Sequence, residues 1–419
     1  MPDCCHVNRS MIGYDHALDI LLGEARPLPF VNLSPADAVG KVLARFLAAP
    51  ISVPSFDNSA MDGFAFSAEN VAGATAESPI VLRVAGASIA GDSAELSHLH
   101  PGTAVKIMTG APLPEGADTV LPVEAASWNH EELTFTAPYP AFQHVRRVGQ
   151  DIEAGKPLLA AGTRLTSAHI PLLSAVGLGR VPVYQAPSAF WISTGQEITD
   201  DFDTPLLPGH IYNATRHYGE RHLPELGMEI KGAMTVRDTP QDFAAALEKA
   251  LDQGPDIILS TGGISAGQYD FVRPVLEDMG ADIIFHKARI KPAKPVLFAV
   301  LPDGRYFFGL PGNPISTALA LRVFVYPFVR ALTGDTPEAP RKARLAADCK
   351  GPADKTAFLM GTVSVDDDGM VSATPDTCQQ SFQTRPFAAS NAWLILPEGT
   401  DCLPAGTLVD WLPIRPGVL

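Results

Sequence analysis

The sequence predicts a multidomain protein of mixed α/β and β architecture, and three observations lead to this fold class. The chain has 419 residues, which is too many for one ordinary hydrophobic core. Short apolar strands that run into glycine turns and helices fill its middle, a pattern typical of an open α/β domain. Short β-rich runs separated by glycine and proline occur before that domain and again near the end of the chain.

From these patterns we predict four parts. A helical N-terminal domain is interrupted by an inserted β-rich domain, which we interpret as a lid. An open α/β ligand-binding domain and a small C-terminal β-barrel follow. The predicted boundaries are, in that order, 1–50 with 141–180, 51–140, 181–335 and 340–419.

Composition and charge exclude several classes of protein. The hydrophobic content of 46% and the charged content of 18% describe a globular chain. The formal net charge of -15 argues against nucleic acid or an anionic membrane as a general partner. We find no run of about 18 apolar residues that could span a bilayer, and no signal peptide in MPDCCHVNRS. The five cysteines are widely spaced without a CxxC motif, so reduced thiols in a cytoplasmic protein are expected.

The segment 14–50 is expected to be helical in two pieces. In the second piece Ser34 could cap a helix and Pro35 could occupy its first turn, before Pro50 and Pro54 end it. The apolar residues at helical spacing in that piece are Val39, Val42, Leu43 and Phe46.

A further helix is predicted after residue 238. Thr239, Pro240 and Asp242 form a typical helix start. The residues Phe243, Leu247 and Leu251 then recur at helical spacing, which predicts that this face of the helix packs on the core.

The central stretch of the chain, 256–317, carries the strongest pattern. Its first part, DIILSTGGISAGQYD, is an apolar strand that breaks into a glycine-rich turn, and the unbroken apolar run suits a strand buried on both faces of a parallel sheet. Later, RYFFGLPGNPIST is a strand that ends in a turn and opens a helix, with Asn313 at the N-cap and Pro314 at the first helical position. Unpaired backbone N–H groups at such turns predict an anion-binding crevice.

Four cations lie between these two turns, within eight residues: Lys287, Arg289, Lys291 and Lys294. In a continuous strand, positions 287, 289 and 291 would point to one face. One interpretation is a solvated basic face. The other is a local trap for an anion, which a negatively charged chain needs in order to bind one. The position between two glycine turns favours the second interpretation and a small ligand that bears phosphate.

Polar groups follow several other predicted strands and turns. Ser193, Thr194, Gly195 and Glu197 come directly after the strand in SAFWISTGQEI, where a phosphate or a metal would bind. The turn in PSFDNSAMDGFAF carries Asp57 and Asp62, for which a surface turn held by its own carboxylates is the alternative interpretation.

The motifs STGGISAGQYD, HKARIKPAKP and GLPGNPIST resemble, in order and spacing, the molybdopterin-binding domain of the MoeA family, the molybdopterin molybdenumtransferases related to the second half of gephyrin. The segment PSFDNSAMDGFAF resembles the family's FDNSAMDGYA, and MTGAPLPEGADTVLPVE resembles MTGAPLPxGADTVVxxE. The resemblance therefore identifies the α/β domain as a molybdopterin-binding domain and implies a site.

The resemblance, together with the chemistry of the residues, gives two predicted sets. The catalytic residues are Asp62, Thr109, Glu197, Asp238, Asp270, Lys287 and Lys291. The residues that bind the pterin substrate are Arg146, Arg147, Ser193, Thr194, Gly195, Gly262, Gly263, Ser265, Gly267, Lys294, Pro311, Gly312, Asn313, Ser316 and Ser381. Asp62, Glu197, Asp238 and Asp270 are the predicted oxygen ligands of Mg²⁺. For Asp238, a carboxylate that only stabilises the following helix start is the alternative.

The chain departs from the family pattern at three glutamines. Gln150 and Gln196 replace acidic residues of the family, and Gln380 replaces a glycine of its QGSG loop, in which Phe382 replaces the second glycine. Without those glycines the loop cannot adopt backbone conformations with positive φ at low cost.

The resemblance implies a function in molybdenum cofactor biosynthesis. Adenylylated molybdopterin would be hydrolysed to AMP, with Mg²⁺, as molybdate is ligated by the dithiolene of the substrate. It also implies a homodimer, with the molybdopterin adenylyltransferase and molybdoenzyme-specific chaperones as further partners. The alternatives are the adenylyltransferase itself and a catalytically weak carrier or scaffold for the pterin.

Overall fold

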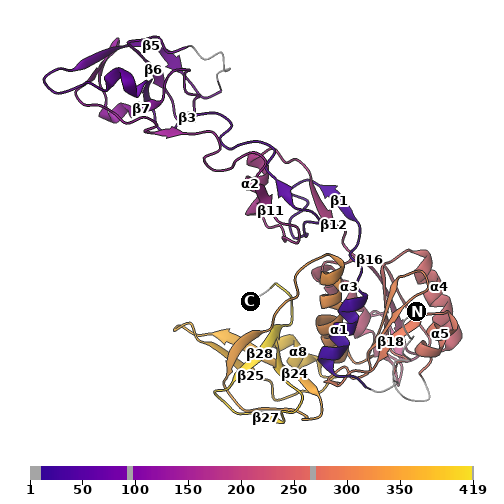
Figure 1. Ribbon diagram of the computed structural model, residues 1–419. Helices are drawn as coiled ribbons and strands as arrows, with labels where there is room; N and C mark the ends of the chain where they lie inside the picture. The colour runs from indigo at the N-terminus through magenta and orange to yellow at the C-terminus, as the bar shows by residue number, and fades with distance from the viewer. Residues whose placement is uncertain (1–10, 92–97, 265–269, 418–419) are drawn as a thin grey trace, which may run out of the picture. The chain divides into compact units, whose positions relative to one another are not determined.

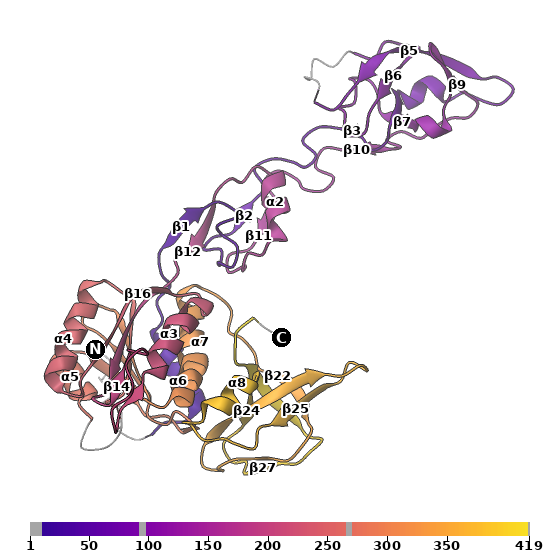
Figure 2. The same ribbon diagram turned by 180° about the vertical axis from the view of Figure 1, so that it is seen from behind.

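The computed structural model of the protein describes residues 11–91, 98–264 and 270–417. The chain divides into two compact units (Figures 1 and 2). One unit is formed by Asn32–Val183, and the other joins Met1–Val31 to Tyr184–Leu419. The larger unit contains the α/β sheet and the C-terminal barrel, and the smaller one contains the inserted β domain.

A six-stranded mixed sheet forms the centre of the larger unit, in the order β16-β13-β17-β21-β20-β18. The first four strands in this order are parallel, and β20 and β18 are antiparallel additions at one edge. The bounds are β13 (Ser188–Thr194), β16 (Glu229–Val236), β17 (Ile257–Thr261), β18 (Asp282–His286), β20 (Leu297–Val300) and β21 (Tyr306–Leu310). The predicted open α/β fold is therefore confirmed.

Helices cover both faces of this sheet (Figures 1 and 2). The strand β17 is buried at every position, and its side chains alternate between two cores. Leu259 packs among α1, α3, α6 and α7, whereas Ile258 packs among α4 and α5. The helices are α1 (Tyr14–Glu24), α3 (Ala214–Glu225), α4 (Pro240–Asp252), α5 (Val272–Asp278), α6 (Pro314–Ala320) and α7 (Tyr326–Leu332). This two-sided burial explains why the strand sequence is continuously apolar.

The helix predicted after residue 238 is confirmed as α4. The hydroxyl of Thr239 accepts a hydrogen bond from the Asp242 backbone N–H at 3.0 Å, so it caps the helix. Phe243 and Leu247 are fully buried, and Leu251 packs against the same core.

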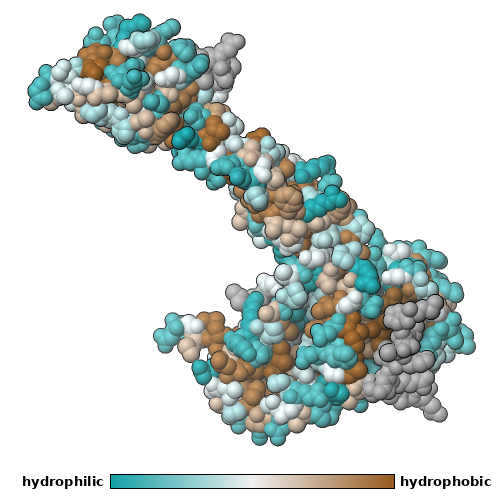
Figure 3. All heavy atoms as spheres, viewed as in Figure 1, coloured by the Kyte–Doolittle hydropathy of each residue, from teal (hydrophilic) through white to brown (hydrophobic). Residues whose placement is uncertain are grey.

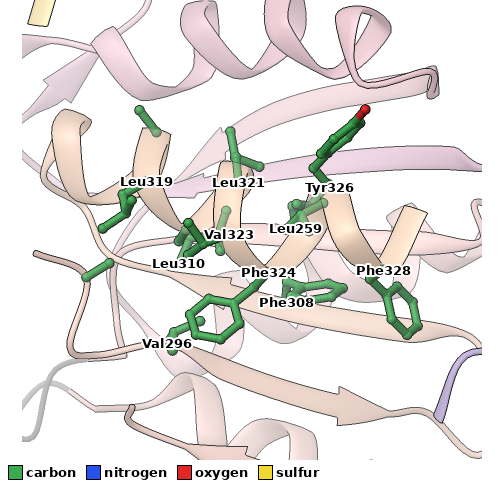
Figure 4. Packing of buried hydrophobic residues seen from close by; sticks show 14 of the residues in the cluster. Leu259, Val296, Phe308, Leu310, Leu319, Leu321, Val323, Phe324, Tyr326 and Phe328 are labelled. Atoms are coloured by element: carbon green, nitrogen blue, oxygen red, sulfur yellow. The ribbon is translucent and has the colours of Figure 1, made fainter. Parts of the chain in front are cut away.

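The helices α6 and α7 are joined by a π-helical turn, Leu321–Val325, into one run of 19 residues. This run passes a test of length and composition for a membrane-crossing helix, although Arg322 and Arg330 interrupt its apolar residues. Its most apolar window is 83% buried inside the protein. Figure 4 shows Leu319, Val323 and Phe328 spaced along this run, in the core cluster that also contains Leu259, Phe308 and Leu310 of the sheet. The hydrophobic residues of this run therefore belong to the core of the domain.

The prediction that residues 287–291 form one continuous strand is wrong. The strand β18 ends at His286, and β19 (Ile290–Lys291) belongs to the C-terminal sheet, where it pairs with β24. Between them Lys287 has a φ of 87°, which no strand residue adopts. The cations at 287, 289 and 291 therefore do not share one strand face.

The C-terminal part is a small closed barrel, as predicted. Its strands run in the order β24-β25-β22-β28-β26, and β26 pairs back with β24. The bounds are β22 (Arg341–Leu345), β24 (Thr356–Val365), β25 (Val371–Pro375), β26 (Ala392–Leu396) and β28 (Leu408–Pro413), with β23 (Cys349–Lys350) paired to β27 (Cys402–Leu403) and the short helix α8 (Thr384–Ala389) before β26. Asp368 and Gly369 lie in the predicted hairpin turn, where Gly369 has a φ of 79°.

The smaller unit contains the predicted β-rich insertion. A six-stranded sheet has the order β7-β4-β6-β5-β9-β8. Phe64, Phe66 and Phe135 are fully buried or nearly so in its core. The bounds are β4 (Gly63–Phe66), β5 (Ile80–Ser88), β6 (Thr103–Ile107), β7 (Thr119–Pro122), β8 (Ser127–Asn129) and β9 (Glu132–Phe135), and outside this sheet lie β2 (Leu47–Ala48), β3 (Asn58–Ser59), β10 (Val145–Arg146), β11 (Pro157–Leu159), α2 (His169–Ala175) and β12 (Val181–Tyr184).

The second predicted helix of the N-terminal segment does not form. Residues 34–46 are turns and isolated bridges, in which Val42 pairs with Arg164 and Leu43 with Val183. Gly40 has a φ of 82°, which ends any helix there. Of the apolar residues at helical spacing, Val42 and Leu43 are buried, but Val39 and Phe46 are exposed. Backbone pairing with distant residues therefore outweighs the local pattern.

The face of the molecule seen in Figure 3 is mixed in character. Hydrophilic residues cover much of both units, and hydrophobic residues form smaller groups among these hydrophilic residues. This distribution is expected of a charged globular chain whose large apolar side chains are mostly in its cores.

Candidate functional site

A cleft of about 540 Å³ opens in the larger unit where the parallel strands β13, β17 and β21 end. Eight of its lining residues are among the predicted site residues, and five of them follow β13, β16 and β17: Thr194, Glu197, Asp238, Gly262 and Gly263. Pro311, Gly312 and Asn313, from the turn after β21, complete the predicted members of the lining. The carboxyl ends of neighbouring parallel strands are the usual ligand site of an open α/β sheet.

Two glycines fix the turn after β17. Gly262 and Gly263 have φ values of 90° and 65°. A Cβ atom on Gly262 would lie 2.5 Å from Thr194 Oγ1 and 2.7 Å from the Thr194 carbonyl oxygen. A Cβ atom on Gly263 would lie 2.6 Å from a ring carbon of Phe271. Both the backbone conformation and the space exclude side chains, so the chain can pass close to β13 and leave the cleft open.

The turn after β21 is braced by the loop that contains Ser381. Asn313 occupies the N-cap position of α6, but its side chain donates to Ser381 Oγ at 3.1 Å instead of capping the helix. The Ile315 N–H donates to the Ser381 carbonyl oxygen, and the Thr317 hydroxyl donates to the Pro311 carbonyl oxygen at 2.6 Å. These bonds fix the turn that borders the cleft. Ser381 thus supports the site residue Asn313 without being part of the lining.

Backbone donors remain available at both turns. The Gly262 N–H donates to Leu310. Among the residues that the structure describes, the N–H groups of Gly263, Gly312 and Asn313 have no protein acceptor. Donors of this kind beside a cleft suit phosphate or another oxyanion.

The predicted carboxylates are distributed unevenly. Glu197 and Asp238 line the cleft. Asp270 follows the glycine turn, and its Oδ1 is buried without a hydrogen-bond partner among the described residues. Within residues 11–91, 98–264 and 270–417, no three His, Cys, Asp or Glu side chains form a preassembled metal group.

Two residues with predicted hydroxyl contacts are buried inside the fold. Ser193 is fully buried, and its Oγ accepts hydrogen bonds from Trp191 Nε1 at 3.0 Å and from Thr261 Oγ1 at 3.3 Å. Ser316 is only 5% exposed in α6. Neither residue belongs to the lining of the cleft, whereas Thr194 does. Ser265 and Gly267 lie outside the described residues.

The basic segment is not gathered around the cleft in the way that the sequence suggests. Arg289 pairs with Glu398 at 3.0 Å and donates to the Met11 carbonyl oxygen at 3.1 Å. Lys291 and Lys294 are exposed, and Lys287 is half-buried. The three lysines are not among the described residues that line the cleft, although Pro295 is.

In the smaller unit, Asp62 and Thr109 are brought together although they are 47 positions apart. Asp62 Oδ1 accepts hydrogen bonds from the Thr109 backbone N–H and from its hydroxyl, both at 2.7 Å. These two bonds, the backbone one first, lower the pKa of the exposed Asp62 carboxyl. Asp62 is therefore a carboxylate held in one orientation on the surface of its unit.

The neighbouring predicted residues have structural contacts. Asp57 accepts a hydrogen bond from the Val148 N–H at 2.7 Å, which is the turn-holding role considered for it. Arg146 lies in β10, and the guanidinium of Arg147 lies 4.5 Å from the centre of the Phe142 ring. The side chain of Gln150 accepts from the Arg147 N–H at 3.0 Å, so this departure from the family pattern stabilises a turn.

Sequence reasoning did not find the apolar part of the cleft. Ile198, Ile211, Tyr212 and Phe382 line it beside the polar residues. Phe382 is 65% exposed, which is unusual for so large an apolar side chain. The sequence feature that could have revealed this apolar lining is Phe382, which replaces a glycine of the family's loop.

Comparison with known proteins agrees with this geometry. Residues 12–177 match the model of the MoeA N-terminal region (domain I and II), residues 190–331 match that of a probable molybdopterin binding domain, and residues 342–414 match that of the MoeA C-terminal region (domain IV). A molybdopterin molybdenumtransferase of Synechococcus elongatus is 36% identical, with 96% of this chain and 99% of that protein covered. The chain belongs to the molybdopterin molybdenumtransferase family. This membership places it among the transferases of molybdenum cofactor biosynthesis.

Other relatives extend over the same length. The molybdopterin molybdenumtransferase of Haemophilus influenzae is 32% identical, with 97% of this chain and 99% of that protein covered. The crystal structure of a molybdopterin biosynthesis MoeA protein from Pyrococcus horikosii has a TM-score of 0.85 at 29% identity, and the match covers 97% of this chain and all of that one. The family resemblance read from the motifs therefore holds for the whole architecture.

Proposed function

We propose that the protein inserts molybdate into adenylylated molybdopterin, with Mg²⁺, and releases AMP. The observation that carries the proposal is the cleft at the ends of β13, β17 and β21, in which unpaired backbone donors and two carboxylates lie together. The substrate that the family handles combines a pterin with phosphate groups, and an oxyanion joins it. A cleft with donors for anions and oxygen ligands for a cation suits both.

The donors of the two turns would hold the substrate's phosphates. Gly263, Gly312 and Asn313 offer N–H groups at fixed positions. The positive φ values of Gly262 and Gly263 fix the first turn, and the hydrogen bond that the Asn313 side chain donates to Ser381 fixes the second. Fixed donors need no reorganisation as charge develops during attack on the phosphoanhydride. Lys287, Lys291 and Lys294 remain predicted contacts of the same anions.

The carboxylates fit Mg²⁺, which proteins commonly bind through one or two carboxylates together with substrate phosphates and water. Glu197 and Asp238 line the cleft, and the buried Oδ1 of Asp270 lacks a partner among the described residues. When bound, the cation would polarise the phosphoanhydride. In the smaller unit, the hydrogen bonds from Thr109 lower the pKa of the Asp62 carboxyl and hold it in one orientation, so it is suited to orient a water or a cation.

The reaction balances without a protein thiol. Water adds to the adenylyl phosphorus, the anhydride bond breaks, and AMP leaves. The two sulfurs of the substrate's dithiolene bind molybdate, and one oxo group of the molybdate leaves as water with the two thiol protons. The chain's own part is to bind, orient and neutralise charge. We further propose a cytoplasmic homodimer that exchanges the pterin with an adenylyltransferase and with molybdoenzyme chaperones.

The test is the release of AMP from adenylylated molybdopterin by the purified full chain, with molybdate and Mg²⁺. We expect release to require both, and the pterin product to carry molybdenum. Tight binding of the pterin without AMP release would overturn the enzyme proposal and support a carrier. Formation of adenylylated molybdopterin from ATP would support the adenylyltransferase alternative instead.

A further inference from the structure

A second pocket, of about 380 Å³, lies in the larger unit between α3, α8 and the end of β28. This pocket is separate from the cleft, because the two share no lining residue. The helix α3 contributes to both, with Ala214 and Thr215 in the lining of the cleft. Its volume is in the range of small-molecule sites. Nothing in the proposed reaction uses it.

Aromatic rings form the walls of the pocket. Tyr218 and His222 stack with centroids 4.9 Å apart and an interplanar angle of 23°. Phe387 meets Tyr218 edge-on at 6.0 Å, and Ile414 adds an apolar surface. Flat aromatic walls of this kind favour a ligand with a planar ring.

Two cations from distant parts of the chain meet at this pocket. Arg221 belongs to α3 and Arg415 follows β28. Neither has a hydrogen bond or an ion pair with another residue that the structure describes. Glu225, the carboxylate in the lining, is bonded to His222. In a chain of net charge -15, two unpaired guanidinium groups at one pocket favour an anionic ligand.

His222 indicates a third property of the ligand, a hydrogen-bond donor. Its side chain is 3% exposed, and burial lowers its pKa, so the ring is neutral near pH 7. Nδ1 lies 3.0 Å from a Glu225 oxygen, and since a carboxylate only accepts, Nδ1 carries the proton. Nε2 is then an acceptor, and it is buried without a partner among the described residues. A ligand with an O–H or N–H donor would satisfy it.

We propose that this pocket is a second small-molecule site, for a planar aromatic acid that also carries a hydrogen-bond donor. The ring would contact Tyr218 and Phe387, the acid group would pair with Arg221 and Arg415, and the donor would bond to His222 Nε2. The inference stands independently of the proposed reaction, because it uses none of the residues of the cleft.

The test is a fluorescence-anisotropy titration of the full chain with 6-hydroxy-2-naphthoate, a planar acid with one donor. We expect saturable binding at one site per chain. Two matched ligands isolate the two polar contacts: 2-naphthoate lacks the donor, and 6-hydroxy-2-naphthamide lacks the charge. Each should bind at least tenfold more weakly than the probe.

Variants locate the binding. Arg415→Gln and Arg221→Gln should each weaken binding of 6-hydroxy-2-naphthoate about tenfold, because each removes a charge-assisted contact at an exposed position. Arg385→Gln, an exposed arginine of α8 outside the lining, should leave it unchanged. Asn313→Ala, in the cleft, should also leave it unchanged. Absence of saturable binding would overturn the site, whatever the outcome of the AMP assay. Binding by the Arg221 and Arg415 variants that is as tight as binding by the unsubstituted chain would overturn it as well.

Discussion

Two regions of the α/β domain were both expected to bind anions, and they differ in how well local sequence determined them. The glycine turn after β17 lies at the cleft with the positive φ values that its sequence requires. The basic segment 287–294 instead begins after the end of β18, only Ile290–Lys291 joins another sheet, and Arg289 pairs with Glu398. A glycine turn is specified by backbone sterics, whereas a row of cations depends on a strand continuing. The first kind of inference is therefore the safer one.

The largest effect is expected from adding a side chain to the glycine turn after β17. Gly262→Ala should destabilise the protein by about 3 kcal/mol and abolish AMP release, because its Cβ would collide with Thr194 in a backbone region that alanine avoids. Gly304→Ala is the matched control: Gly304 has a φ of 85° but no atom within 4 Å of the added carbon. It should cost about 1 kcal/mol. Urea unfolding measures both, and equal losses would contradict the role of close approach.

Next come the carboxylates of the cleft. Glu197→Gln and Asp238→Asn should each lower AMP release about 100-fold or more with little change in unfolding, because charge is lost while shape is kept. Glu248→Gln, on the exposed side of α4, is the control. Steady-state kinetics over a range of Mg²⁺ concentrations measures the effect. If added Mg²⁺ acted identically on both variants and the wild type, the cleft would not be the cation site.

The basic segment provides a smaller contrast. Lys291→Ala should lower AMP release about tenfold at unchanged thermal stability, because this exposed lysine is a predicted contact of the substrate's anionic groups. Arg289→Ala should leave turnover near wild type and reduce stability by about 0.5–1 kcal/mol, because its pair with Glu398 is partly exposed. The reverse result would mean that the roles of these cations are exchanged.

The smallest effect concerns the pKa of Asp62. The two bonds from Thr109 hold it low, so the carboxylate stays charged to a lower pH than usual and its bonds are lost only as pH falls through that value. Thr109→Val removes the hydroxyl but keeps the backbone donor, so the pKa of Asp62 should rise part of the way towards its ordinary value. NMR titration of the carboxyl carbon measures this, and an unchanged pKa would remove the hydroxyl as a cause.

Much of the fold was accessible from the sequence. The buried strand β17, the capped helix α4 and the hairpin at Gly369 follow from local rules. The turns at 34–46 did not, because their apolar residues satisfy a helical pattern while their backbone pairs with residues such as Arg164. A rule based on neighbouring residues cannot identify pairing partners that are distant in the sequence.

The candidate site was predicted only in part, because some of its residues are placed by local sequence and others by tertiary contacts. Glycines and strand-end carboxylates are placed by the sheet, so Glu197 and Gly262 could be placed at the cleft. The burial of Ser193 depends on Trp191 and Thr261, and the exposure of Phe382 depends on the path of a loop from another domain. These are tertiary facts that a strand-end rule cannot supply.

The most direct measurement is a crystal structure of the full chain with molybdate and AMP bound. We expect oxyanion density beside the N–H groups of Gly263, Gly312 and Asn313, at the carboxyl ends of β17 and β21. Density for both ligands elsewhere, with the two glycine turns facing only solvent, would contradict it.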